Sequence, residues 1–138
     1  MGSESEAGWD ACTTTNLFFP TCATGTSDKR CRMYLAWTTV ATRAEANRLG
    51  KGAVKAGLAV CAQIEGPIRS HYRWKGQLHM DGEFKICFKC MPQKRLSLES
   101  HVLKRHPYDT PEWIVVKAAH VGEKYLSWAR STDTNQPL

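Results

Sequence analysis

The spacing of apolar residues from position 33 onward predicts an alternation of strands and helices. Short apolar, β-prone runs are separated by stretches in which apolar residues recur every three or four positions. This β-α-β-β-α-β order, followed by one more helix, is typical of an α+β, ferredoxin-like sandwich. The predicted strands cover 33–40, 59–78, 83–91 and 113–119, and the predicted helices cover 42–56, 94–105 and 121–130.

Local signals indicate where several of these elements end. Thr42 and Glu45 form a capping box at the start of the first helix, and Gly57 is suited to the position just after its end. Gly66-Pro67 predicts a bulge or bend within the second strand. Asp81-Gly82 is a typical hairpin signal, so we expect the turn between the second and third strands there.

The same periodicity predicts which side chains face the core. In the third strand, one face carries Phe84, Ile86 and Phe88, and the other carries Lys85, Cys87 and Lys89. In the last two helices, the residues expected to point inward are Leu96, Leu98, Val102, Leu103, Val121, Tyr125 and Trp128.

The predicted central hairpin is long for a small domain. Its first arm greatly exceeds the typical strand length of about five or six residues. One chain cannot cover such a hairpin, and a free strand edge invites pairing with another subunit. We therefore expect an oligomer.

Residues 1–31 differ from the rest of the chain. They are rich in Ser, Thr and Gly and follow neither the strand nor the helix period, so we expect a partly disordered N-terminal extension before a domain at 32–138. The extension carries a net charge of −2 and the domain one of +8. A basic domain can attract anions, or it can simply have a well-solvated surface.

The cysteines and the N-terminal sequence indicate the cellular compartment in which the protein is expected. Six cysteines occur in a chain that is 42% hydrophobic, which is enough for a core without disulfides. We find no signal-peptide pattern and no apolar run of about 18 residues. We therefore expect a cytoplasmic protein with reduced thiols and no membrane segment.

Few residues form a recognisable chemical motif. Cys87 and Cys90 resemble a redox motif or half of a zinc site, but residues three apart in a strand point to opposite faces and cannot share a metal or a disulfide. His106 lies at a helix-to-loop corner before Pro107, where it can be a capping histidine, a metal ligand or an anion contact. The alternating basic and aromatic residues of the run 71–75 suit either a ligand-binding wall or a subunit interface.

Taken together, these segments resemble the CutA divalent-cation-tolerance family over about residues 34–130. The resemblance is carried by Ala59-Val60-Cys61, Tyr72-x-Trp74-x-Gly76, the strand from Glu83 to Lys89, His106-Pro107-Tyr108 with Thr110-Pro111-Glu112, and Tyr125-Leu126-Ser127-Trp128. It implies a homotrimer with an architecture similar to the PII signalling proteins, and an association with copper and other divalent metals.

The resemblance also suggests site residues. His106 matches the histidine of the family's H-P-Y corner, whereas Arg105 and Thr38 stand where some members have a second histidine and a cysteine. Copper favours thiolate and imidazole ligands, so a lone imidazole implies weak binding. The positions expected to line a cleft between subunits are Lys89, Tyr108, Glu112 and Trp74.

The sequence therefore predicts a non-enzymatic homotrimer in copper and divalent-cation tolerance that binds Cu²⁺ or another divalent metal weakly through His106. The alternative is a PII-like sensor that binds a small anion at its subunit clefts. We expect no organic cofactor and no nucleic-acid partner, because no catalytic set, nucleotide fingerprint or RNA-binding aromatic string is present.

Overall fold

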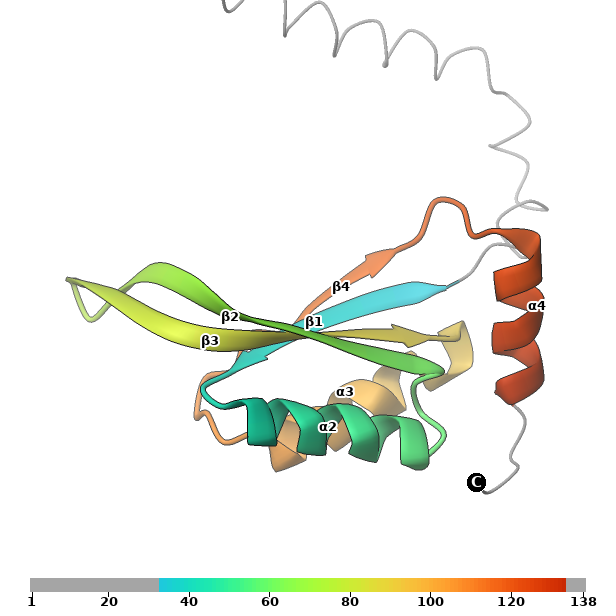
Figure 1. Ribbon diagram of the computed structural model, residues 1–138, viewed down its shortest axis with the longest axis horizontal. Coiled ribbons are helices and arrows are strands. Elements are labelled where there is room, and N and C mark those ends of the chain that lie inside the picture. Colours follow the sequence, from blue (N-terminus) through green and yellow to red (C-terminus); the bar gives the residue numbers. More distant parts are fainter. Residues whose placement is uncertain (1–32, 134–138) are drawn as a thin grey trace, which may run out of the picture. The chain divides into compact units, whose positions relative to one another are not determined.

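The computed structural model describes residues 33–133, and its centre is a four-stranded antiparallel sheet (Figure 1). The strand order is β2-β3-β1-β4, so β1 and β3 lie inside the sheet and β2 and β4 form its edges. The predicted ferredoxin-like fold is thus confirmed, whereas the expected extension at 1–31 lies outside the described residues. The strands are β1 (Tyr34–Val40), β2 (Cys61–Trp74), β3 (Gln77–Cys90) and β4 (Ile114–Lys117).

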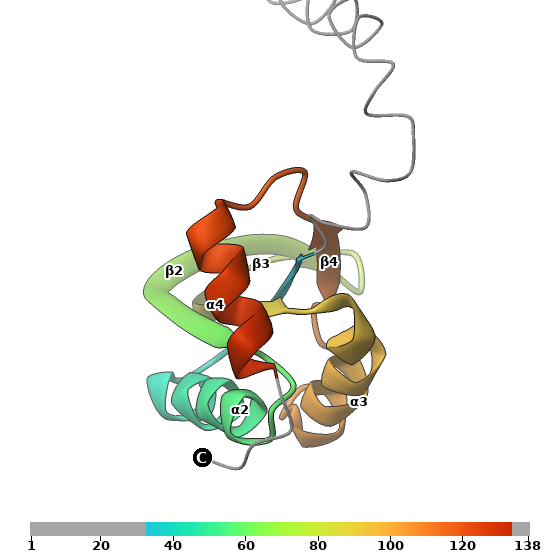
Figure 2. The same ribbon diagram turned by 90° about the vertical axis from the view of Figure 1, so that its right-hand side faces the viewer.

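Two helices cover one face of the sheet and a third lies at its end (Figure 2). Helices α2 (Arg43–Lys55) and α3 (Arg95–Arg105) lie on the same side, with the short 3-10 turn η2 (Pro92–Lys94) before α3. Helix α4 (Glu123–Thr132) packs through Leu126 and Ala129 on a small second cluster with Met33 and Met91. The main core lies between the sheet and the two covering helices and is formed by Ala36, Val40, Ala46, Leu49, Ala53, Ala59, Ile86, Phe88, Cys90, Leu98 and Val102.

The start and the end of α2 follow from local chemistry. The Thr42 side chain accepts a hydrogen bond from the Glu45 amide at 3.2 Å, as the capping box predicts. Gly57, with φ of 74°, follows the C-cap residue Ala56 in the left-handed conformation that glycine adopts without strain.

The hairpin turn lies six residues before its predicted place. Trp74 pairs with Gln77, which leaves Lys75 and Gly76 as a two-residue loop with φ of 50° and 78°. Positive φ at both positions defines the type I′ turn, which suits the twist of a hairpin. The Asp81-Gly82 prediction was wrong because these residues continue β3 opposite Ser70 and Arg69.

The bulge in β2 is confirmed and depends on one glycine. The register shifts between Glu65 and Ile68, where Gly66 adopts φ of 148°. A Cβ atom there would lie 2.8 Å from Cδ1 of Phe84 and 3.0 Å from the Glu83 carbonyl oxygen. Only glycine fits this close approach of two strands.

The face of the sheet opposite α2 and α3 carries apolar side chains that the described residues leave partly uncovered. Ile114 is 49% and Val116 39% exposed, beside half-buried Trp37 and Leu35. The outer half of the hairpin also extends past α2, and every residue from 71 to 78 is exposed (Figure 1).

Three side chains that we expected to point inward are exposed. Leu96 is 67% exposed, because Leu98 and Val102 alone form the fully buried positions of α3. Tyr125 and Trp128 are 37% and 44% exposed, because α4 buries Leu126 and Ala129 instead. In α3 the prediction of Leu98 and Val102 as inward-facing is confirmed and only Leu96 was wrong, whereas in α4 the buried face is shifted by one residue.

Candidate functional site

His106 connects the end of α3 to the inner strand β1. It is the C-cap of α3 and has extended backbone angles, φ −71° and ψ 136°, as expected before a proline. Its Nδ1 accepts the Tyr108 N–H at 3.0 Å. Its Nε2 lies 2.9 Å from the Thr38 hydroxyl and 3.1 Å from the Thr39 carbonyl oxygen. Both ring nitrogens are therefore engaged within the subunit.

These contacts assign the tautomer. Thr38 donates its hydroxyl proton to the Glu112 carbonyl oxygen at 2.7 Å, so its oxygen can only accept from His106. Because Nδ1 accepts from Tyr108, the ring proton resides on Nε2 and points at β1. Burial lowers the pKa of His106, against a smaller opposing effect of the Thr39 hydrogen bond, so the ring is neutral at pH 7.

A buried carboxylate lies beside this corner. Tyr108 donates its hydroxyl to Oε2 of Glu83 at 2.9 Å, and Glu83 is only 9% exposed. Burial, together with the hydrogen bond to Glu83, raises the pKa of Tyr108 well above its ordinary value. The phenol is thus a permanent donor that stabilises the Glu83 carboxylate.

The remaining predicted cleft residues do not meet His106 within one subunit. Lys89 lies six residues from Glu83 along β3, and its amine sits 5.3 Å from the centre of the Tyr125 ring. Trp74 ends β2 at the hairpin turn and is 48% exposed. Glu112 joins the corner through its backbone carbonyl alone, while its residue is exposed.

Thr38 and Glu83 complete the corner, and sequence reasoning assigned neither of them this role. Thr38 was noted only as the replacement for a cysteine, although a fully buried threonine in an inner strand must find a hydrogen-bond partner. Glu83 was noted only as the start of a strand. A buried acid across from the predicted H-P-Y corner is visible only after folding, because 25 residues separate it from Tyr108.

The described cysteines are free thiols, and the separation of Cys87 from Cys90 is confirmed. Cys90 faces the core and is fully buried, which raises its pKa to about 11. Cys87 points to the open face with half-buried Cys61. Within residues 33–133 no three His, Cys, Asp or Glu side chains gather as a metal cluster.

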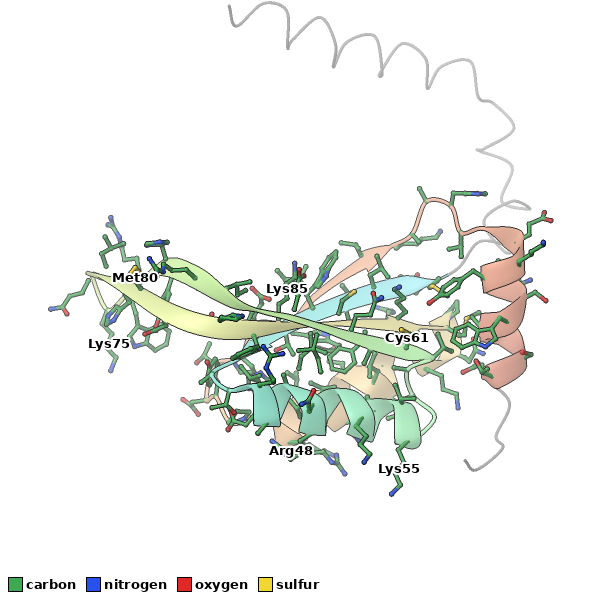
Figure 3. The ribbon with its side chains drawn as sticks, in the orientation of Figure 1. Arg48, Lys55, Cys61, Lys75, Met80 and Lys85 are labelled. Atoms are coloured by element: carbon green, nitrogen blue, oxygen red, sulfur yellow. The ribbon has the colours of Figure 1, made fainter. Side chains whose placement is uncertain are left out.

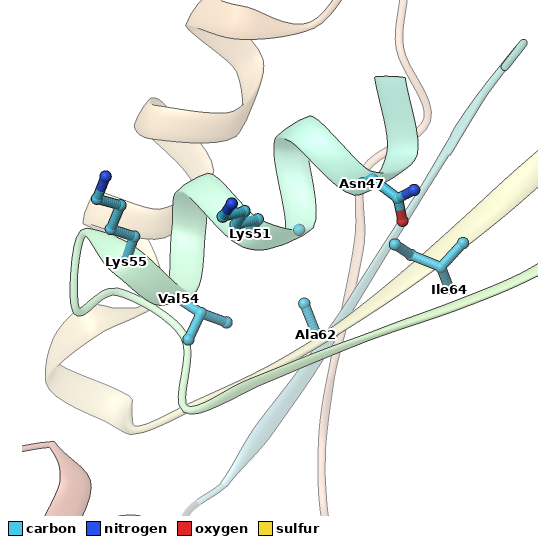
Figure 4. Close-up of a pocket in the computed structure, with 7 residues that line it drawn as sticks. Asn47, Lys51, Val54, Lys55, Ala62 and Ile64 are labelled. Carbon is cyan, nitrogen blue, oxygen red and sulfur yellow. The ribbon is translucent and has the colours of Figure 1, made fainter. Parts of the chain in front are cut away.

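A groove of about 550 Å³ lies between α2 and the inner half of β2 (Figure 4). Val54, Ala62 and Ile64 form its apolar floor, and Lys51 and Lys55 lie at its rim. None of the predicted site residues lines it, so it is separate from the His106 corner. Figure 3 shows Lys75 and Met80 near the hairpin turn, and Cys61 at the opposite end of β2.

Comparison with known proteins identifies the family. The family model described as CutA1 divalent ion tolerance protein matches residues 34–132. This chain belongs to the CutA1 family. The match covers every strand and helix described above, and it confirms the resemblance found in the sequence.

Individual CutA proteins align over most of the described chain. The divalent-cation tolerance protein CutA of Thermotoga maritima is 31% identical over 100 residues, which is 72% of this chain and 98% of that protein. CutA of Synechococcus elongatus superimposes with a TM-score of 0.72 at 36% identity, covering 75% of this chain and 92% of the other. The structure described as the periplasmic divalent cation tolerance protein CutA of Archaeoglobus fulgidus has a TM-score of 0.70 at 26% identity, covering 73% and 98%. The chain spans 60% of the length of the chloroplastic CutA of Arabidopsis thaliana, to which it is 30% identical.

Proposed function

We propose that this CutA1 family member is a homotrimer that serves copper and divalent-cation tolerance by binding metal weakly, without catalysis. The observation that carries the proposal is that the sheet of residues 33–133 has two edge strands with an unpaired side and one partly uncovered face. Strands β2 and β4 each pair on one side only within the described residues, and the open face of the sheet exposes the apolar side chains of Ile114 and Val116 on β4. Such edges and faces are costly to expose.

The two sheet edges are different strands, which limits how copies can meet. If the β2 edge of one subunit pairs with the β4 edge of the next, the contact is heterologous and can close into a ring. A three-membered ring would direct the open faces of three sheets toward a shared axis and would cover the apolar side chains of Ile114, Val116 and Trp37. The long β2–β3 hairpin would reach over a neighbouring subunit.

The divalent metal would bind at the His106 corner. Only Nδ1 of the neutral ring has a lone pair, and it accepts the Tyr108 amide. A metal must displace this hydrogen bond, which accounts for weak binding. Because imidazole binds metal only when neutral, and burial lowers the pKa of His106, the affinity should fall in acid at a pH below the ordinary histidine value of about 6.5.

Two measurements on the full chain test this proposal. Light scattering at micromolar concentration should give the mass of a trimer, and a monomer would refute the assembly. Titration with Cu²⁺ should show weak binding that His106→Ala removes, whereas His79→Ala, near the hairpin turn, should not change it. Cys12 and Cys22 are replaced by serine beforehand, because thiols bind or reduce copper. If His106→Ala titrates as its parent does, the metal assignment is wrong.

Failure of the metal assignment would favour the second candidate, a sensor that binds a small anion between subunits. It is supported by the basic domain and by the placement of the cleft residues. Trp74 lies at the hairpin turn, and Lys89 lies at the opposite end of β3 beside Tyr125 of α4. We therefore expect Trp74 and Lys89 to approach Tyr108 and Glu112 from another subunit. Binding of a small carboxylate or nucleotide that is lost in Lys89→Gln would separate this candidate from the metal role.

The proposal places the protein in the cytoplasm. Cys61, Cys87 and Cys90 are free thiols, which suits a reducing compartment. In the described part of the chain, no helix is long and apolar enough to cross a membrane.

A further inference from the structure

Two thiols from neighbouring strands share the open face of the sheet. Cys61 lies opposite Lys89 in the β2–β3 register, and Cys87 lies opposite Gln63. Side chains two residues apart on a strand point the same way, so Cys61 and Cys87 are diagonal neighbours on one face. Both are free and half-buried, and they are close enough to interact electrostatically.

The diagonal spacing favours a bridging metal over a disulfide. Diagonal residues in an antiparallel pair are about 7–8 Å apart, beyond the usual Cα separation of disulfide-bonded cysteines. A metal ion bound to two thiolates at about 2.3 Å each holds the sulfurs up to about 4.6 Å apart, more than twice the S–S bond length. Cys61 and Cys87 can therefore bridge a metal without movement of the strands.

The surroundings supply charge that a bis-thiolate site needs. Lys85 and Lys89 flank Cys87 on β3, and both lower its pKa, although burial has the larger, opposite effect. Glu65 is the acidic group near Cys87, and it lies 3.9 Å from the Lys85 amine. A monovalent cation on two thiolates leaves a net charge of −1, which these lysines can balance.

We propose that Cys61 and Cys87 form a two-coordinate thiolate site for a soft monovalent cation of the Cu⁺ type. Thiolates select Cu⁺ over harder ions, and two opposed sulfur ligands suffice for it. On binding, each thiol releases one proton to solvent and forms one sulfur–metal bond, and no electron is transferred because the metal arrives as Cu⁺. This site goes beyond the proposed divalent role and uses none of the His106 corner.

The test uses the full chain with Cys12, Cys22 and Cys31 replaced by serine. Cu⁺ is supplied without oxygen as its acetonitrile complex, in competition with bathocuproine disulfonate, whose Cu⁺ complex is read by absorbance. The parent should withdraw one Cu⁺ per subunit from the chelator. Cys61→Ser and Cys87→Ser should each lower the affinity by at least about 100-fold, because loss of a direct ligand exceeds the 10–100-fold cost of losing a supporting group.

Cys90→Ala is the matched control, because it removes the thiol that faces the core while both proposed ligands remain. It should keep the parent's Cu⁺ affinity, and X-ray absorption of the loaded parent should show two sulfur neighbours. No Cu⁺ uptake by the parent, parent-like affinity in Cys61→Ser and Cys87→Ser, or a metal surrounded by nitrogen and oxygen alone would each overturn the site. The Cu²⁺ titration of His106→Ala and its parent is repeated with Cys61 and Cys87 replaced by serine, so that failure of either site is seen separately.

Discussion

The hydrogen bonds of His106 give a stability prediction that can be resolved atom by atom. The ring makes one hydrogen bond through Nδ1, to the Tyr108 amide, and one set through Nε2, to Thr38 and Thr39 of β1. A hydrogen bond contributes about 0.5–1.5 kcal/mol net, so His106→Ala should lower the free energy of unfolding by about 1–3 kcal/mol.

Two further variants divide this loss between the nitrogens. The amide oxygen of the asparagine in His106→Asn lies near the place of Nδ1 and can still accept the Tyr108 N–H. This variant should therefore lose only the stability that the Nε2 hydrogen bonds contribute. The longer glutamine in His106→Gln can place its amide N–H near the position of Nε2 and donate to the Thr39 carbonyl. This variant should therefore lose only the stability that the Nδ1 hydrogen bond contributes. Each variant should therefore unfold between His106→Ala and the parent.

The assay is guanidinium unfolding followed by circular dichroism, with subunit concentration held fixed because assembly adds to the apparent stability. The comparison is repeated from pH 8 to pH 5. Folding lowers the pKa of His106, so protonation favours the unfolded chain. The difference in free energy of unfolding between the parent and His106→Asn should be largest above about pH 6.5 and should shrink as the pH falls below that value. A parent-like midpoint for His106→Ala, or a difference that grows in acid, would refute the hydrogen-bond assignment.

Three other substitutions have expected outcomes. Thr42→Ala removes the cap of α2 and should cost about 0.5–2 kcal/mol in thermal unfolding; Thr42→Ser, which keeps the hydroxyl, should cost less, and equal losses would contradict the cap. Gly66→Ala should destabilise by more than about 1 kcal/mol, since its Cβ would meet Phe84 at 2.8 Å, and an unchanged melting temperature would rule out the bulge geometry. Tyr108→Phe leaves the buried Glu83 carboxylate without its phenol donor and should lower the free energy of unfolding by about 1.5–3 kcal/mol, and an unchanged free energy of unfolding would argue against this pair.

Local chemistry allowed much of the fold to be predicted. The capping box at Thr42, the left-handed Gly57 and the bulge at Gly66 each depend on interactions within a few residues, or on a backbone angle that few residues adopt. The ferredoxin-like fold was predicted from the order of strands and helices along the chain. The turn was misplaced because Lys75-Gly76 carries a weaker signal than Asp81-Gly82, although both can adopt positive φ.

The candidate site was predictable only in part. The H-P-Y corner was found from the sequence, but its partners Thr38 and Glu83 come from strands far along the chain. The buried face of α4 was also misjudged, and so was Leu96 of α3, since Leu96, Tyr125 and Trp128 fit a helical stripe as well as the residues that are buried.

The sequence by itself determined the element types, their order, the caps and the family, because these depend on periodicity, short-range hydrogen bonds and motif spacing. The tertiary structure alone decided the hairpin register, the rotation of α4 about its axis, and the occupation of both nitrogens of His106. It also placed Cys61 as a diagonal neighbour of Cys87 on one face of the sheet. These features depend on contacts between residues distant in sequence. Strand register is one such contact pattern, and a shift of one residue would turn every side chain of a strand to the other face of the sheet.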